Sequence, residues 1–472
     1  MRSPKPVFVI PTHRLRDVGA TVESYDEHFR KNGHSIDMVV FDDSSAVNQQ
    51  KYFPLLEQTT TQNPLWYVGP QEKEQFLSLL FARLKDRKLE PLIRNLFRPS
   101  YGGNRNWTLI YTLGDHMISA DDDMRPFALM EDSPETLDDG VVCRGSVKRH
   151  GQNGYTKKSF DILTAFQDVL GKPVRDTPLN HERGALLIDT AMDLETNASQ
   201  GLHRENNLQL KPGVIDDAAI IKMAQTFRSG TNDIDALDFV EMYLDDDAQV
   251  SIEELNEVYV LENFRPAITE LNWRMDCGVA GYDNTLGLPP FFPTRLRFED
   301  YIYRLWIQQP GFVSAHVDAA QNHMKNNYMR DPLPSEVFNE EVANLLKRKI
   351  KGSVSKIDEL SIMFDYEGEV TQGDSDTILG RIRELHGRVI AASRKARGAR
   401  RESLKTFAVS LERAFFGFDS DFFQQKLIYI VDDVINQFKG SLEIWPTLVE
   451  ICFLRKQRAE LPRLRVANQR RH

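Results

Sequence analysis

The 472-residue chain lacks the features that mark secreted, disulfide-bonded and membrane-spanning proteins. Its three cysteines, Cys143, Cys277 and Cys452, lie too far apart for a metal-ligand motif, and we expect reduced thiols rather than disulfides. No apolar run is long enough to cross a bilayer, and residues 1–6 lack the apolar segment of a signal peptide. We therefore expect a soluble, cytoplasmic protein.

Positive charge is also scarce in this chain. It has 59 Lys and Arg against 69 Asp and Glu, a net charge of −10. This balance argues against a nucleic-acid-binding protein, whose main domain would present a basic surface. Only residues 381–472 are basic, with 19 Lys and Arg against 10 Asp and Glu. This tail is either a solvated end, which we favour, or a contact for acidic lipid or a partner.

A strand–helix–strand unit opens the chain. Residues 7–12 form a continuous apolar strand, residues 17–31 have apolar side chains at helical spacing, and residues 36–41 form a second strand. This pattern predicts a parallel sheet. Asp42 and Asp43 follow the second strand, at the edge where open α/β sheets bind ligands. An Asp-Asp-Ser-Ser turn is equally a helix N-cap, so both interpretations stay open.

Three consecutive aspartates, Asp121, Asp122 and Asp123, follow another apolar strand at residues 116–120. Their charges repel one another, so a fold has little reason to gather them unless a cation removes the repulsion. Oxygen ligands at alternate positions suit Mg²⁺ or Mn²⁺, above all when a substrate's phosphates complete the coordination. In isolation the segment would be read as a solvated acidic turn, and only the rest of the chain favours a site.

Two other segments carry groups that could act with this turn. Two glycines lead into a predicted helix that begins with Arg105 and Asn106, where free N–H groups and a guanidinium could meet a diphosphate. Glu299 and Asp300 lie in the first turn of a further predicted helix, where the helix dipole favours carboxylates for stability alone. His316 ends a short apolar segment downstream.

Helical patterns dominate the second half of the chain. Residues 190–265 are polar and mostly helical in pattern, as in an insertion, and helical spacing without strand signals continues from about residue 333. The apolar stripe within residues 422–438 is typical of a helical bundle core or a dimer face. We predict a first domain over residues 1–330 and an all-helical region over residues 331–472.

In this order the motifs resemble those of a GT-A fold glycosyltransferase of the family-2 type, over roughly residues 5–325. Each motif alone is common, and their order and spacing carry the resemblance. It implies a Rossmann-like, mostly parallel sheet with flanking helices, preceding the helical C-terminal region. The segments are Ile10-Pro11-Thr12-His13-Arg14, Phe41-Asp42-Asp43-Ser44-Ser45, Gly102-Gly103-Asn104-Arg105-Asn106, Ala120-Asp121-Asp122-Asp123 and Glu299-Asp300.

The resemblance also implies roles for single residues. Four groups would bind the nucleotide-sugar donor, with one of the two aspartates after the second strand on the base: Pro11, Thr12 and Arg14; Asp42 or Asp43; Arg105 and Asn106; Asp121 and Asp122. Asp121 and Asp123 match the two acids of the DxD motif, which touches the ribose and binds the metal. Asp300 matches the general base of inverting members, Glu299 would orient it, and His316 lies where some members supply a third metal ligand.

The implied activity is a Mn²⁺- or Mg²⁺-dependent transfer of sugar from a UDP-, GDP- or TDP-sugar to a saccharide, glycolipid or small hydroxylated acceptor. Asp300 points to inversion, and a retaining enzyme of the same fold stays open. So do a nucleotidyltransferase and a nucleotide-sugar-binding module without transferase activity. The implied location is cytoplasmic, with the C-terminal helices available for a homo-oligomer or for contact with the inner face of a membrane. No nucleic-acid partner is expected.

Overall fold

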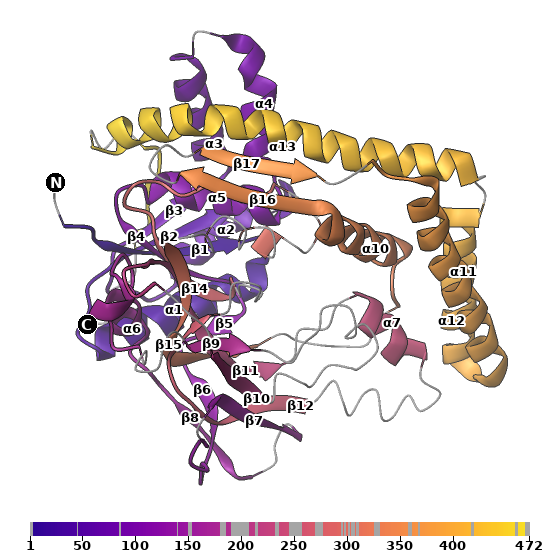
Figure 1. Cartoon of the computed structure of the whole chain (residues 1–472), viewed down its shortest axis with the longest axis horizontal. Coiled ribbons are helices and arrows are strands. Elements are labelled where there is room, and N and C mark those ends of the chain that lie inside the picture. Colours follow the sequence, from indigo (N-terminus) through magenta and orange to yellow (C-terminus); the bar gives the residue numbers. More distant parts are fainter. Residues whose placement is uncertain are drawn as a thin grey trace.

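The computed structural model of this chain describes most of the 472 residues (Figure 1). Ser45 and most of the helix predicted after Glu299 lie outside the described residues. The described residues are 3–44, 46–84, 86–138, 140–149, 153–179, 186–189, 207–212, 216–231, 236–244, 257–269, 277–293, 296, 299–300, 303, 307, 311–324, 331–356, 361–366, 369–416, 420–457 and 461–467.

The first third of the chain forms the parallel part of a large sheet. Strands β1 (Pro6–Thr12), β2 (Asp37–Asp42) and β3 (Leu65–Val68) are separated by α1 (Leu15–Lys31) and α2 (Ala46–Gln58). Strand β4 (His116–Ala120) pairs with β1 on its other side, so β3, β2, β1 and β4 run parallel in that order. The predicted strand–helix–strand unit is confirmed. The carboxyl ends of β1, β2 and β4 therefore meet at one edge.

The rest of the sheet is mixed, so the expected mostly parallel sheet is wrong. Strand β14 (Val279–Asp283) runs antiparallel to β4 and to β11 (Ile220–Thr231), and β11 runs parallel to β15 (Phe312–His323). Parallel neighbours need a long crossover, usually a helix, and helices separate only the first four strands. Short connections follow β4, and they permit antiparallel pairing.

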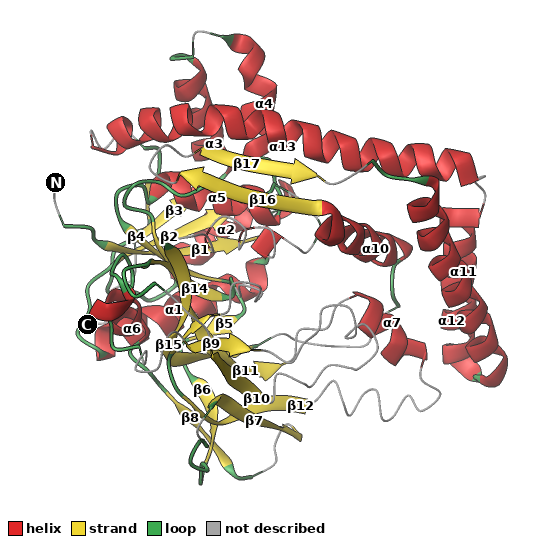
Figure 2. Ribbon diagram, in the orientation of Figure 1, coloured by secondary structure: helices red, strands yellow, loops and turns green. Residues whose placement is uncertain are grey.

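The remaining elements before residue 331 complete this sheet and its cover (Figure 2). The helices are α3 (Pro70–Phe81), η1 (Arg87–Leu89), α4 (Glu90–Leu96), α5 (Tyr101–Tyr111), α6 (Ile162–Gln167), η2 (Val174–Asp176) and α7 (Ala236–Leu244). The strands are β5 (Met124–Arg125), β6 (Ala128–Glu131), β7 (Val141–Arg149), β8 (Tyr155–Lys158), β9 (Leu186–Asp189), β10 (Asn207–Pro212), β12 (Glu257–Phe264) and β13 (Ala267–Thr269).

The mostly helical insertion expected at residues 190–265 is also wrong for its described part. That part contains three strands, β10, β11 and β12, and one short helix, α7. Strand β11 is 12 residues long and almost entirely buried, because sheet neighbours flank it on both sides. A strand buried on both faces has no alternating pattern, which makes short apolar and mixed runs ambiguous in sequence.

The C-terminal region is helical, as predicted, but not all-helical. Its helices are α10 (Pro334–Lys349), α11 (Gln372–Lys395), α12 (Gly398–Leu411), the π-turn η5 (Glu412–Phe416) and the 38-residue α13 (Ser420–Gln457). Strands β16 (Ile350–Lys356) and β17 (Ser361–Tyr366) form a hairpin, and β18 (Leu464–Arg465) pairs with the edge strand β3. Figure 1 shows α13 crossing the top of the molecule, with α11 and α12 side by side at its far end.

Helix α13 packs onto the first region through both apolar and polar contacts. The indole N–H of Trp445 donates to the carbonyl oxygen of Leu288 at 2.8 Å, and Lys456 Nζ lies 2.5 Å from Asp115 Oδ2. One continuous hydrophobic core contains Trp107 from α5 and Trp445 from α13. The chain segments on either side of the predicted boundary at residue 330 thus share a core. In the described part of the chain, no helix combines the length and apolar character needed to cross a membrane.

Candidate active site

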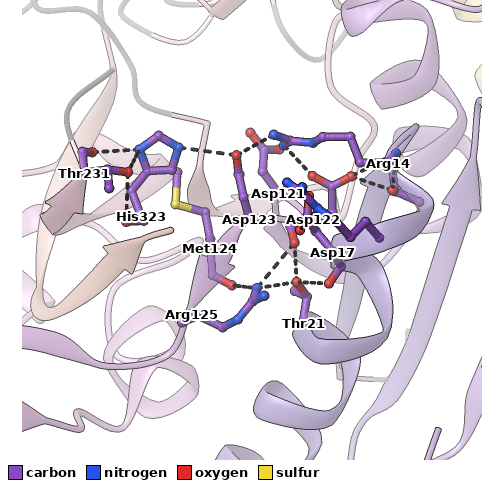
Figure 3. Close-up of polar contacts among 12 residues, drawn as sticks. Arg14, Asp17, Thr21, Asp121, Asp122, Asp123, Met124, Arg125, Thr231 and His323 are labelled. Atoms are coloured by element: carbon purple, nitrogen blue, oxygen red, sulfur yellow. Dashed lines mark hydrogen bonds and ion pairs between the residues drawn. The ribbon is translucent and has the colours of Figure 1, made fainter. Parts of the chain in front are cut away.

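The acidic turn lies at the carboxyl end of β4 and is fixed by main-chain hydrogen bonds (Figure 3). The N–H of Asp121 donates to Gly278 O at 2.8 Å, which ties the turn to the segment before β14. The carbonyl oxygen of Asp123 accepts from the N–H of Met324 at 2.9 Å, just beyond the end of β15. The turn is thus held between two neighbouring segments of the sheet.

Asp122 points inward and joins this turn to the end of β1. It is 1% exposed, and its Oδ2 accepts from Thr12 Oγ1 at 2.5 Å and from the N–H of Arg14 at 3.3 Å. The Arg14 guanidinium forms an ion pair with its other oxygen. Burial raises the pKa of Asp122, and Arg14 opposes that rise. Thr12 and Arg14, with Pro11 preceding them in β1, therefore lie at the acidic turn as the sequence motif predicts.

Asp123 faces both an arginine and a histidine. Its Oδ2 lies 2.6 Å from Arg14 Nη1 and 3.3 Å from His323 Nε2. His323 Nδ1 lies 2.8 Å from the carbonyl oxygen of Thr231, which fixes the ring (Figure 3). Burial acts to raise the pKa of Asp123, but His323 and Arg14 outweigh it and hold the pKa below its usual range.

Arg105 connects the acidic turn to the second carboxylate motif. Its Nη2 lies 2.9 Å from Asp121 Oδ1, and its Nε lies 3.8 Å from Glu299 Oε1. A third contact, from Nη1 to the carbonyl oxygen of Cys277 at 3.5 Å, completes its surroundings. The guanidinium is buried in α5. One side chain therefore bridges two motifs that are far apart in the sequence.

The carboxylates around Arg105 outweigh its charge. Burial raises the pKa of Asp121, although Arg105 opposes the rise. Burial, followed by the charge of the adjacent Asp300, raises the pKa of Glu299 to about 8. Glu299 is 8% exposed, whereas Asp300 is only partly buried. This pair consequently retains a proton near neutral pH, as two neighbouring acids do when they cannot both ionise.

Asp42 and Asp43, the two predicted base contacts, hold the scaffold behind the site. Asp42 is fully buried, and its Oδ2 accepts from the hydroxyl of Tyr67 at 2.8 Å. Asp43 accepts from the N–H of Ser100 at 2.9 Å and pairs with Lys73 at 3.2 Å. Ser100 is the N-cap of α5, so Asp43 helps to position the helix that carries Arg105. No described contact places either carboxylate at the acidic turn.

Asn106 is likewise committed to the scaffold. It is fully buried, and its amide nitrogen donates to the carbonyl oxygens of Leu96 and Phe291 at 2.9 Å and 3.0 Å. Its amide oxygen accepts from the N–H of Phe291 at 2.7 Å. These three hydrogen bonds use the amide to join α5 to neighbouring chain, so it points away from Arg105's partners. Adjacent residues on a helix face different directions, which explains the separation.

The structure brings His323 to Asp123, and it places His316 elsewhere on the same strand. The Nδ1 of His316 lies 3.0 Å from Thr269 Oγ1, and its ring packs on Phe227 with centroids 5.1 Å apart. The predicted third metal ligand at His316 is therefore replaced by His323. Strand β15 runs seven residues farther than the apolar segment that defined it in sequence. A rule that picks the polar residue at the true strand end would have selected His323.

The residues present fit a divalent cation by their chemistry. Asp123 offers hard oxygen and His323 offers imidazole nitrogen, a donor set that suits Mn²⁺ or Mg²⁺ completed by substrate phosphates. The carbonyl of Thr231 on Nδ1 leaves Nε2 facing Asp123, which is the usual arrangement of a ligating histidine. In the absence of substrate Arg14 pairs with Asp123. No group of three or more His, Cys, Asp or Glu side chains within the described ranges is arranged to hold an ion.

Comparison with known proteins adds no relative to this picture. Neither a scan against protein-family models nor a search of curated proteins finds a match to the chain. The residues and their geometry are therefore the basis for a functional proposal.

Proposed function

We propose that this protein is a metal-dependent glycosyltransferase of the GT-A type, which moves a sugar from a nucleoside-diphosphate sugar to an acceptor hydroxyl. The observation that carries the proposal is the bridge made by Arg105. It joins Asp121, in the motif expected to hold the donor, to Glu299, beside the expected base. A transferase needs these two functions on either side of the reacting carbon.

The donor side is built for a leaving group that gains negative charge. Arg14 and Arg105 bring two guanidinium groups to the acidic turn, and such groups bind phosphate oxygens in a two-pronged geometry. Asp123 and His323 would hold the Mn²⁺ or Mg²⁺, with Asp121 on the ribose. When bound, the ion would stabilise the departing diphosphate as a Lewis acid.

The acceptor side needs a base that is exposed enough to meet a hydroxyl. Asp300 is only partly buried, whereas Glu299 is buried beside Arg105. Asp300 would accept the proton of the acceptor hydroxyl as that oxygen attacks the sugar carbon. Glu299 would hold the position of Asp300 and the proton balance of the pair. A single displacement of this kind inverts the anomeric centre, and the acceptor is a saccharide, a glycolipid or a small hydroxylated compound.

A donor screen tests the proposal directly. UDP-, GDP- and TDP-sugars are added with Mn²⁺ or Mg²⁺, and the thermal midpoint and the release of nucleoside diphosphate are measured. We expect one donor to raise the midpoint in a metal-dependent way and to be turned over. Asp123→Ala should abolish both responses, whereas Asp138→Ala should keep them, because Asp138 is 75% exposed and pairs only with Arg144 among its described contacts.

Two outcomes would contradict parts of the proposal. If no donor raises the midpoint and none releases nucleoside diphosphate, the transferase assignment is wrong. A product with the donor's own anomeric configuration would instead retain the fold and donor site but remove Asp300 as the base of a single displacement. Binding without any turnover would favour a nucleotide-sugar-binding module.

A further inference from the structure

One buried amide on the site side of the sheet has no partner. Gln321 lies in β15, and none of its surface is exposed. Neither its amide nitrogen nor its amide oxygen has a hydrogen-bond partner among the described residues. Leaving both ends of a buried amide unpaired is unfavourable, and native proteins seldom do so without a reason.

The direction of this side chain follows from the strand. Alternate residues of a strand face the same side, so Gln321 shares a face with His323, whose ring meets Asp123. Two residues span about 6–7 Å along a strand, so the amide lies one sugar ring's length from the acidic turn. The register places Arg228 of β11 beside Gln321.

The neighbouring amide provides a comparison within the same strand. Asn322 faces the other side, and its Oδ1 lies 3.4 Å from Ser229 Oγ, a hydroxyl that also accepts from the N–H of Leu129. The amide that faces away from the acidic turn thus has a protein partner. The amide that faces the turn has none, which is the pattern expected of a group kept for a ligand.

The chemistry of an amide selects the kind of ligand. A primary amide offers two N–H donors and one acceptor oxygen, and a sugar hydroxyl both donates and accepts. Phosphate oxygens only accept, so they would leave the amide oxygen unpaired. On the basis of the proposed function, we propose that Gln321 binds a hydroxyl of the transferred sugar and helps to select the donor's sugar.

The test separates the sugar from the nucleotide. Wild-type protein and Gln321→Leu, each with Mn²⁺, are titrated with UDP, GDP and TDP, and with UDP-glucose, GDP-mannose and TDP-glucose, while the thermal midpoint is followed. We expect Gln321→Leu to unfold at the same or a higher temperature without ligand, because an unpaired amide is removed. It should keep the response to the nucleoside diphosphate and bind the sugar conjugate about tenfold more weakly, the loss of roughly one hydrogen bond.

Asn63→Leu is the matched control, since it removes a buried amide that does have partners. Asn63 accepts from the N–H of Ile36 and donates to Asp26, each at 2.9 Å, so its loss should lower the midpoint and leave the sugar-dependent response intact. If Gln321→Leu behaves like Asn63→Leu, its amide is structural and the inference is overturned. If wild-type protein responds to none of the six compounds, the proposed function fails and this inference fails with it.

Discussion

The two ends of strand β4 hold acidic residues in opposite ways. At its beginning, buried carboxylates each have a lysine of their own. Asp115 lies 2.5 Å from Lys456, and Asp283 lies 2.7 Å from Lys222. Burial acts to raise the pKa of Asp283, but Lys222 outweighs it and holds the pKa below its usual range. These pairs close one edge of the sheet.

At the carboxyl end of the same strand, the acids have to share their cations. Arg14 serves Asp122 as well as Asp123, and Arg105 serves both Asp121 and Glu299. Burial raises the pKa values of three of these carboxyls, those of Asp121, Asp122 and Glu299. The negative charge at this end is therefore only partly balanced.

The difference separates an edge that supports the fold from one that is prepared for a ligand. Balanced, buried pairs hold the structure together when both partners are present. An excess of one charge costs stability, and it persists in proteins chiefly where function requires it. The same change of a carboxylate to an amide should therefore have opposite consequences at the two ends.

The largest effect is expected on the chemistry at the carboxyl end. Asp300→Asn should lower sugar transfer by about 10²–10⁴-fold, the usual contribution of a general base. Donor binding and the urea midpoint should stay close to those of wild type, because Asp300 is only partly buried. Initial rates of nucleoside diphosphate release, with donor titrations in parallel, provide the measurement. Transfer at the wild-type rate would remove Asp300 from the mechanism.

The largest effect on stability is expected at the opposite end. Asp283→Asn leaves Lys222 as a buried charge without a counter-charge and should lower the free energy of unfolding by about 3 kcal/mol. Urea denaturation measures it. Adding Lys222→Met to the same chain should recover a large part of the loss, because it removes the unpaired charge. Equal stability of the single variant and wild type would show that the pair does not stabilise this edge.

An intermediate effect concerns pH and Glu299. The pKa of this buried carboxyl is raised from 4.5 to about 8, so between these values the folded protein keeps a proton that the unfolded chain has released. The free energy of unfolding should accordingly fall as pH rises from about 4.5 to 8, by on the order of 1–2 kcal/mol. Glu299→Gln should remove this part of the fall in urea denaturation at pH 5 and pH 8. An unchanged difference between the two pH values would count against a retained proton.

The smallest effect is expected for Asp121→Asn. Removing one carboxylate from an acid-rich, partly exposed position should change the free energy of unfolding at pH 8 by about 1 kcal/mol or less, toward higher stability. Urea denaturation beside Asp283→Asn makes the comparison, since the two variants differ only in the end of the sheet they affect. A loss as large as that of Asp283→Asn would mean that both ends are equally structural.

The sequence by itself determined the parallel part of the fold and the centre of the site. Continuous apolar runs define β1, β2 and β4, and helices between them dictate parallel pairing. Parallel pairing then brings the carboxyl ends together, which is why Thr12, Arg14 and the acidic turn meet as predicted. Arg105 also reaches Asp121 from the helix that precedes β4. These outcomes depend on patterns within short stretches of chain.

Only the tertiary structure decided which histidine reaches the turn and which predicted donor contacts serve the scaffold. His323 replaces His316 because pairing with β11 extends β15 beyond its apolar segment. Asp43 and Asn106 bond to main-chain groups that arrive from distant parts of the sequence. The antiparallel half of the sheet and the core shared with α13 arise in the same way. Strand ends and side-chain partners are fixed by such long-range contacts, and local spacing carries no record of them.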